Sequence, residues 1–153
     1  MINCDLLIVT APYTETNYPL QAPAIIKASV VKNGYTANTF DINNDFLQME
    51  DEDAEGFAWL KNFFMYGTME DKTKIHLAES YVKYMAEKVL NKFSPKFIAV
   101  SVFTYQCQTF SEMFAEAIKS MDPNISIVFG GQGIMTQGIN ASDGWVKTLR
   151  KSK

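Results

Sequence analysis

The chain has 153 residues, of which 47% are hydrophobic and 20% are charged, and its formal net charge is −3. This length predicts a single domain with a sizeable core, and the slight acidity gives no reason to expect a nucleic-acid partner. No apolar run approaches the roughly 18 residues that span a bilayer. The first residues also lack the basic start and apolar core of a signal peptide. We therefore expect a cytoplasmic protein.

The two cysteines and the single histidine do not indicate a metal or catalytic site. Cys4 and Cys107 lie far apart in apolar surroundings, which predicts buried free thiols rather than a disulfide or a metal pair. His76 has no Cys, His or acid at metal-ligand spacing, which is typical of a residue at the rim of a core. No partner is visible that would activate a nucleophile.

The first part of the chain reads as a strand, a loop, a helix and a second strand. The apolar run Leu6–Thr10 predicts a central strand, and the proline-flanked polar stretch Ala11–Pro19 predicts a loop. Leu20–Asn33 predicts a helix that Gly34 ends, because glycine adopts the left-handed conformation cheaply. Thr36–Ile42, which mixes polar and apolar residues, predicts an edge strand. The helix stripe expected to face the sheet comprises Leu20, Ala24, Ala28 and Val31, with Ile25 beside it.

Residues 46–93 predict a helical insertion that is longer than a plain crossover needs. The acidic run Met49–Glu55 is typical of a solvated helix start, where carboxylates favour the positive end of the helix dipole; a metal site is the weaker alternative. The aromatic stripe Phe57–Phe64 predicts a core-facing helix that ends near Gly67. A long helix then follows from about Glu70 to Phe93.

A strand–helix–strand unit occupies the next stretch. Phe97–Val102 and Ile125–Phe129 are apolar on both faces, as strands of a buried parallel sheet are. Between them, apolar residues from Cys107 to Met121 recur at spacings of three and four, which predicts an amphipathic helix. Ligands of open α/β sheets bind outside the carboxyl ends of the strands. We therefore expect a functional site where these strands end, near Ser101 and Gly130.

Several familiar strand-end sites do not match these loops. A P-loop requires lysine and Ser/Thr where this chain has Ile139 and Asn140. A dinucleotide fingerprint follows the first strand, whereas Gly131-Gln132-Gly133 follows the fourth and lacks the third glycine. The ends of the first and third strands lack the acids of a receiver domain, and no glycine follows the first strand as in a flavodoxin phosphate loop.

Taken together, the chain resembles the cobalamin-binding domain at the N-terminus of many radical SAM enzymes. The resemblance rests on a strand, a proline-containing loop, a Pro-Leu pair that opens a helix, and a Lys-x-Gly that ends it. Here these are Leu6–Thr10, Pro12, Pro19-Leu20 and Lys32-Asn33-Gly34. It extends to Asp41 after the second strand, to the helical insertion, to Ser101-Val102-Phe103 at a Ser-x-Leu position, and to Gly130-Gly131 at a Gly-Gly position.

The resemblance implies a flavodoxin-like parallel sheet of order 2-1-3-4-5, with the corrin over the carboxyl ends of the strands. The nucleotide tail of the cofactor then enters a slot lined by the serine and the glycines, since glycine leaves the backbone bare and a serine hydroxyl can donate a hydrogen bond. The cofactor-binding residues that it implies are Pro12, Tyr13, Pro19, Leu20, Gln21, Ser101, Phe103, Gly130, Gly131 and Gly133.

The resemblance implies no metal ligand and no catalytic residue on this chain. The Asp-x-His-x-x-Gly motif that supplies a cobalt-ligating histidine in one branch of the family is absent. There is no C-x-x-x-C-x-x-C motif, and two cysteines cannot hold a cubane iron–sulfur cluster alone. Radical chemistry would therefore depend on a partner, namely a radical SAM domain or protein.

The sequence ends where a relative begins its fifth strand, so we expect a sheet of order 2-1-3-4. Residues 1–153 then form one cobalamin-binding-like domain, which is either a fragment of a longer enzyme or a free-standing protein. A helix over Ala141–Lys151, with Trp145 facing inward, or a second copy of the chain in a homodimer would cover the edge strand.

Three functions stay open at this point. The first is a cobalamin-binding module that serves a radical SAM partner. The second is a cofactor-free interaction module that kept the fold and lost the ligand. The third is a flavin or nucleotide binder that uses the same strand-end crevice.

Overall fold

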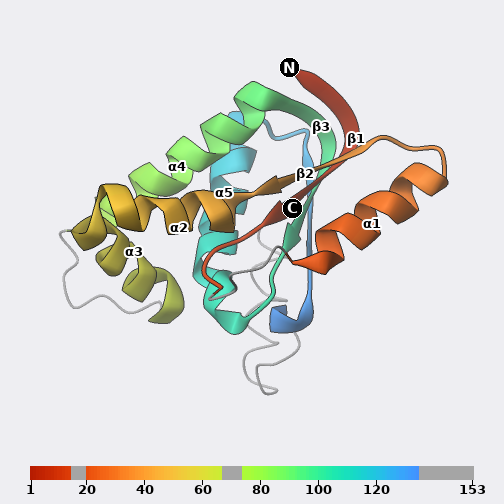
Figure 1. The fold of residues 1–153 in the computed structure, drawn as a ribbon. Helices are drawn as coiled ribbons and strands as arrows, with labels where there is room; N and C mark the ends of the chain where they lie inside the picture. The colour runs from red at the N-terminus through yellow and green to blue at the C-terminus, as the bar shows by residue number, and fades with distance from the viewer. Residues whose placement is uncertain (15–19, 67–73, 135–153) are drawn as a thin grey trace.

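The computed structural model describes residues 1–14, 20–66 and 74–134, which fold around a four-stranded parallel sheet (Figure 1). The strand order is β2-β1-β3-β4, and every pair of neighbours is parallel. This confirms the predicted α/β class and the order 2-1-3-4, and it is consistent with a flavodoxin-like fold. The elements are β1 Ile2–Thr10, α1 Gln21–Lys32, β2 Ala37–Asp41, α2 Ile42–Glu52, α3 Ala54–Tyr66, α4 Ile75–Lys92, β3 Phe93–Ser101, α5 Gln108–Met121 and β4 Ser126–Gly130, with short 3₁₀ turns η2 Tyr105–Cys107 and η3 Gln132–Ile134.

The two central strands begin earlier than the sequence predicts. β1 starts at Ile2 and β3 at Phe93, so Pro95 lies inside β3, paired with Cys4 of β1. Proline lacks an amide proton, so it is tolerated only where one side of a strand is open. Here β4 begins to pair with β3 only at Phe97, and Pro95 precedes that point.

The helical insertion consists of three helices in the described residues, α2, α3 and α4. The predicted second strand is one residue too long at its end, because α2 begins at Ile42 directly after β2. Asp41 caps this helix, since its Oδ1 accepts a hydrogen bond from the Asn44 amide at 3.1 Å. The acidic run therefore covers the end of α2 and the start of α3 rather than one helix start. Asp53 caps α3 by accepting from the Gly56 amide at 2.9 Å.

The sheet has one thickly covered face and one thinly covered face. Figure 1 shows α2, α3, α4 and α5 on one side of the sheet and α1 on the other. This follows from right-handed crossovers, because the chain moves from β1 outward to β2 and then back across to β3 and β4. The main core lies on the four-helix side, where the predicted aromatic stripe of α3 is buried together with Phe46, Phe110 and Phe114.

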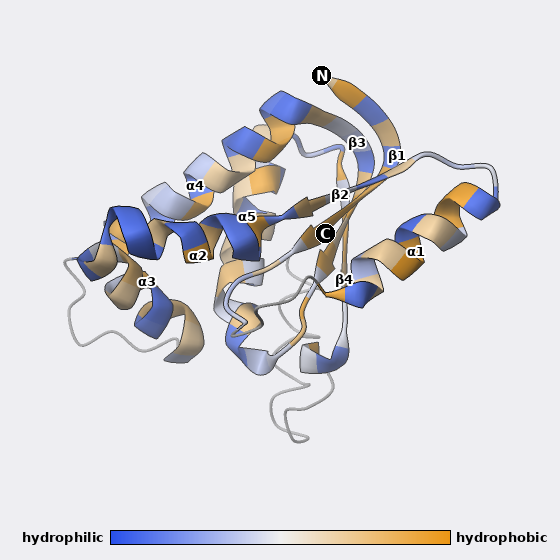
Figure 2. Cartoon of the chain, in the orientation of Figure 1, coloured by the Kyte–Doolittle hydropathy of each residue, from blue (hydrophilic) through white to orange (hydrophobic). Residues whose placement is uncertain are grey.

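The helix on the other face does not pack as its sequence predicts. Of the residues of α1, only Pro23 is buried; Ala24 and Ala28 are exposed, and Val31 is 52% exposed although it belongs to the predicted sheet-facing stripe. Figure 2 shows hydrophobic residues along this helix, which lies on the thinly covered face of the sheet. A gap therefore remains between α1 and the strands.

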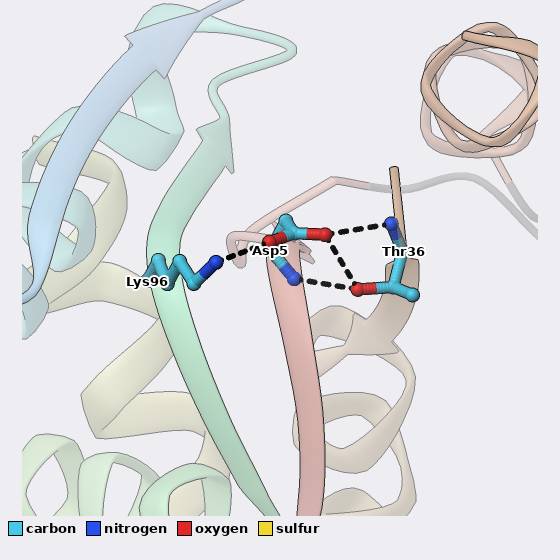
Figure 3. Close-up of polar contacts among 3 residues, drawn as sticks. All are labelled: Asp5, Thr36 and Lys96. Atoms are coloured by element: carbon cyan, nitrogen blue, oxygen red, sulfur yellow. Dashed lines mark hydrogen bonds and ion pairs between the residues drawn. The ribbon is translucent and has the colours of Figure 1, made fainter. Parts of the chain in front are cut away.

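A cluster of hydrogen bonds and one ion pair joins β1, β3 and the residue before β2 (Figure 3). Asp5 accepts hydrogen bonds from Lys96 Nζ at 2.7 Å, from the Thr36 amide at 2.9 Å and from Thr36 Oγ1 at 2.8 Å. The Lys96 ammonium and the Thr36 donors hold the pKa of the Asp5 carboxyl well below its ordinary value. The cluster links the residue before β2 to β1 and β3.

This cluster predicts a loss of stability in acid. A depressed folded-state pKa stabilises the fold fully above the unfolded pKa, about 4 for aspartate, and the contribution disappears as the pH falls below that value. We expect urea unfolding of the wild type to show a larger drop in stability from pH 6 to pH 2.5 than unfolding of Asp5→Asn. The difference should be modest, because Lys96 is largely exposed. Equal pH dependence of the two proteins would contradict a stabilising role of the ionised Asp5 carboxylate.

None of the helices in the described ranges is both long and apolar enough to cross a membrane. The predicted helix over Ala141–Lys151, with Trp145, lies outside the described residues.

Candidate functional site

Four residues from four strands form one row across the carboxyl end of the sheet. Thr10 is paired with Asp41 of β2 and with Ser101 of β3, and Ser101 is paired with Gly130 of β4. Side chains of paired residues in parallel strands lie on the same face. The row, called here the strand-end row, therefore presents a carboxylate, two hydroxyls and a bare glycine on the face that carries α1.

Backbone hydrogen bonds hold the strand ends together beyond this row. The Ala11 amide donates to the Ser101 carbonyl at 3.4 Å, and the Val102 amide donates to the Gly130 carbonyl at 2.7 Å. In the turn η3, the Gly133 amide donates a hydrogen bond to the Val102 carbonyl at 2.9 Å. The predicted proximity of Ser101, Gly130 and Gly133 is thus present in the structure.

The three glycines that the sequence assigns to the site differ in what surrounds them. A Cβ on Gly131, whose φ is +120°, would overlap the Val102 carbonyl oxygen, and a Cβ on Gly133 would overlap the Thr104 carbonyl. These two are glycines because the chain packs closely on itself. A Cβ on Gly130 would meet no atom of the described residues within 4 Å. Of the three, only Gly130 leaves open space that a ligand could enter.

The described residues that directly follow β1, Ala11–Thr14, are buried. Tyr13 is 4% exposed, and its ring lies 6.2 Å from that of Phe46 and 6.4 Å from that of Phe57. The side-chain amide of Asn43 fastens the loop, since it accepts from the Thr14 amide at 3.0 Å and donates to the Thr14 carbonyl at 3.2 Å. The Tyr13 side chain therefore packs in the core against α2 and α3.

The remaining predicted site residues are spread around the carboxyl end of the sheet. Pro12 is buried next to Ala11, and Phe103 is 39% exposed just beyond β3. Leu20 lies at the N-terminal end of α1 and lines a pocket with Thr10, whereas Gln21 is exposed and is not part of that lining. Pro19 lies outside the described residues.

A pocket of about 580 Å³ lies between α1 and the carboxyl-terminal halves of β1 and β2. Its polar lining consists of Thr10, Thr39, Asp41 and Lys27, and its apolar wall is the stripe of α1 described above. Among the residues that the structure describes, those lining the pocket come from β1, β2 and α1 with its preceding residue Leu20. Sequence analysis noted Asp41 but missed Thr10 and Lys27, because only the strand register and the position of α1 bring them together.

The cysteines are free and buried, as predicted, and burial raises the pKa of both thiols. Cys107 contacts Tyr13 and Thr104 rather than a metal ligand, since its Sγ lies 3.6 Å from the Tyr13 carbonyl oxygen and 3.6 Å from Thr104 Oγ1. Within the described ranges, no three His, Cys, Asp or Glu residues lie close enough to hold a metal ion.

The fold and the row define the class of this protein as an α/β domain with a flavodoxin-like parallel sheet whose strand ends converge on one polar face. No family model matches the chain, and no curated protein or solved structure matches it either.

Proposed function

We propose that this chain is a cobalamin-binding module in which the nucleotide tail of the cofactor lies against Ser101 and Gly130. The observation that carries the proposal is the register pair of these two residues, together with the open space at the Gly130 Cβ position. A serine hydroxyl beside a bare backbone offers a hydrogen bond and close approach to a flat, bulky group.

The residues present fit the tail of the cofactor but supply no ligand for its cobalt. The described strand ends carry hydroxyls and a carboxylate, and His76 lies on α4, an element that covers the opposite face. Bound cobalamin would supply an organometallic carbon carrier, and the protein would supply its position. Ser101 and Gly130 would hold the tail, and the apolar residue Phe103 would lie near the edge of the site.

The proposal includes a partner, because two cysteines cannot hold a cubane iron–sulfur cluster alone. A radical SAM domain or protein would provide that chemistry, and this chain would deliver the cofactor to it. β4 is the last strand of the sheet in the described part of the chain, and a homodimer through this edge is part of the same proposal.

A cofactor-free interaction module is the second candidate, and exposed apolar side chains favour it. Phe97 of β3 is 47% exposed and Val128 of β4 is 54% exposed. Both lie on the same sheet face as Ser101 and Gly130, because they are separated from them by an even number of residues along each strand. An apolar surface of this kind also suits a protein partner.

Titration with hydroxocobalamin, followed by visible spectroscopy and calorimetry, tests the proposal. We expect saturable binding by the wild type and at least a tenfold loss of affinity in Gly130→Trp, because the indole would fill the open space beside Ser101. Ser126→Trp is the matched control, since it places the same side chain on the same face of β4 at its other end. This control should retain wild-type affinity.

The glycine variant must be chosen with the backbone in mind. Gly131→Trp would lose binding for a trivial reason, because its side chain overlaps the Val102 carbonyl and disturbs the fold. Absence of binding to folded wild type at high micromolar cobalamin would overturn the cofactor proposal and favour the interaction module. Equal affinity of Gly130→Trp and wild type would show that the nucleotide tail does not lie against Gly130.

A further inference from the structure

The gap beneath α1 is bounded by a helix that does not close onto the sheet. The helix stripe that lines it contains Ala24 and Ala28, whose small side chains leave room, with Val31 toward the C-terminal end of the helix. Its volume of about 580 Å³ falls within the range of small-molecule sites, about 300–1,000 Å³. An apolar ring system could lie along this alanine wall with little loss of helix packing.

The floor of the gap carries polar groups from β1 and β2. Thr10 is 5% exposed and lines the gap, and it is the register partner of Asp41. The Asp41 carboxylate uses Oδ1 to cap α2, while no described residue donates a hydrogen bond to Oδ2.

One positive charge completes the lining. Lys27 lies on the same stripe of α1 and forms no ion pair with a described residue. The gap therefore combines a flat apolar wall, a carboxylate acceptor beside a buried hydroxyl, and an ammonium group. These three features lie within one cavity and derive from α1, β1 and β2.

We propose that this gap binds a nucleoside 5′-monophosphate. The base would lie on the wall formed by Ala24 and Ala28, where small side chains admit a planar ring. The ribose hydroxyls would donate to the Asp41 carboxylate and bond to Thr10, and the phosphate would pair with Lys27. The site differs from the Ser101–Gly130 position, because its lining includes neither residue, and the inference does not rest on cobalamin binding.

The test is calorimetric and NMR titration of the full chain with adenosine 5′-monophosphate and with adenosine. We expect both to bind, with the monophosphate tighter. Ala28→Phe should reduce the affinity for both at least tenfold, because the ring fills the gap. Ile25→Phe is the matched control on the same helix: Ile25 is 65% exposed, lies outside the lining and should leave affinity unchanged.

Two further variants separate the parts of the ligand. Lys27→Gln should weaken the monophosphate several-fold and leave adenosine unaffected. Asp41→Asn should weaken both, while its side-chain oxygen can still cap α2. Gly130→Trp should retain nucleotide binding, which distinguishes this site from the cobalamin position.

Two results would overturn the proposal. The first is the absence of binding of either compound to the folded wild type at millimolar concentration. The second is binding that Ala28→Phe, confirmed as folded by circular dichroism, leaves unchanged.

Discussion

Replacing Phe46 with alanine is expected to lower the free energy of unfolding by about 3–5 kcal/mol. Phe46 is fully buried, and its ring lies 5.0 Å from the ring of Phe57, 5.5 Å from that of Tyr81 and 5.8 Å from that of Phe64. It joins α2, α3 and α4, so its removal leaves a cavity that these helices cannot fill without moving. Urea unfolding monitored by circular dichroism measures the effect.

Phe97→Ala is the matched control for this prediction. Phe97 is the same residue type, but it lies on the thinly covered face and is about half exposed. We expect a loss of about 1 kcal/mol, because less apolar surface returns to water and no closed cavity forms. If the two variants lose similar stability, the aromatic cluster around Phe46 is not the centre of the core.

The two adjacent glycines at the end of β4 are expected to differ in how much stability the same substitution costs. Gly131→Ala should lower the free energy of unfolding by about 2–4 kcal/mol, since φ is strained for an L-residue and the new methyl group overlaps the Val102 carbonyl. Gly130→Ala should change it by less than about 0.5 kcal/mol, because its Cβ would stand in open space.

Thermal and urea unfolding of the two variants in parallel provide the measurement, and each glycine serves as the control for the other. A tolerated Gly131→Ala would mean that the turn at η3 relaxes easily. A destabilising Gly130→Ala would mean that its surroundings are filled. In that case the open space that supports the proposed cobalamin position would be absent.

The sequence predicted the architecture because each element carries a local signal. The apolar runs at Leu6–Thr10 and Ile125–Phe129, and the three-four spacing between Cys107 and Met121, are properties of neighbouring residues and need no tertiary information. The start of β3 was missed because Pro95 is a strong local breaker. A proline can stand inside β3 because β4 begins to pair with β3 only after it, and the point where this pairing begins is a property of the assembled sheet.

The helix α1 also shows that local sequence patterns do not determine packing. Its stripe of Leu20, Ala24, Ala28 and Val31 is periodic enough to predict burial, and the helix forms as expected. How closely a helix approaches a sheet depends on the side chains of both surfaces. Here the structure leaves a gap.

The sequence alone determined the α/β class, the buried free thiols and the strand ends at which to look for a site, because these follow from residue type and periodicity. Only the tertiary structure decided the composition of that site. Register brought Asp41, Thr10, Ser101 and Gly130 into one row, although they are spread over more than a hundred residues of chain. The tertiary structure also places Tyr13 in the core. A Cβ on Gly131 would overlap the backbone of Val102, whereas a Cβ on Gly130 would not meet the described residues. Burial and close contact depend on residues that are distant in sequence, so the sequence alone does not reveal them.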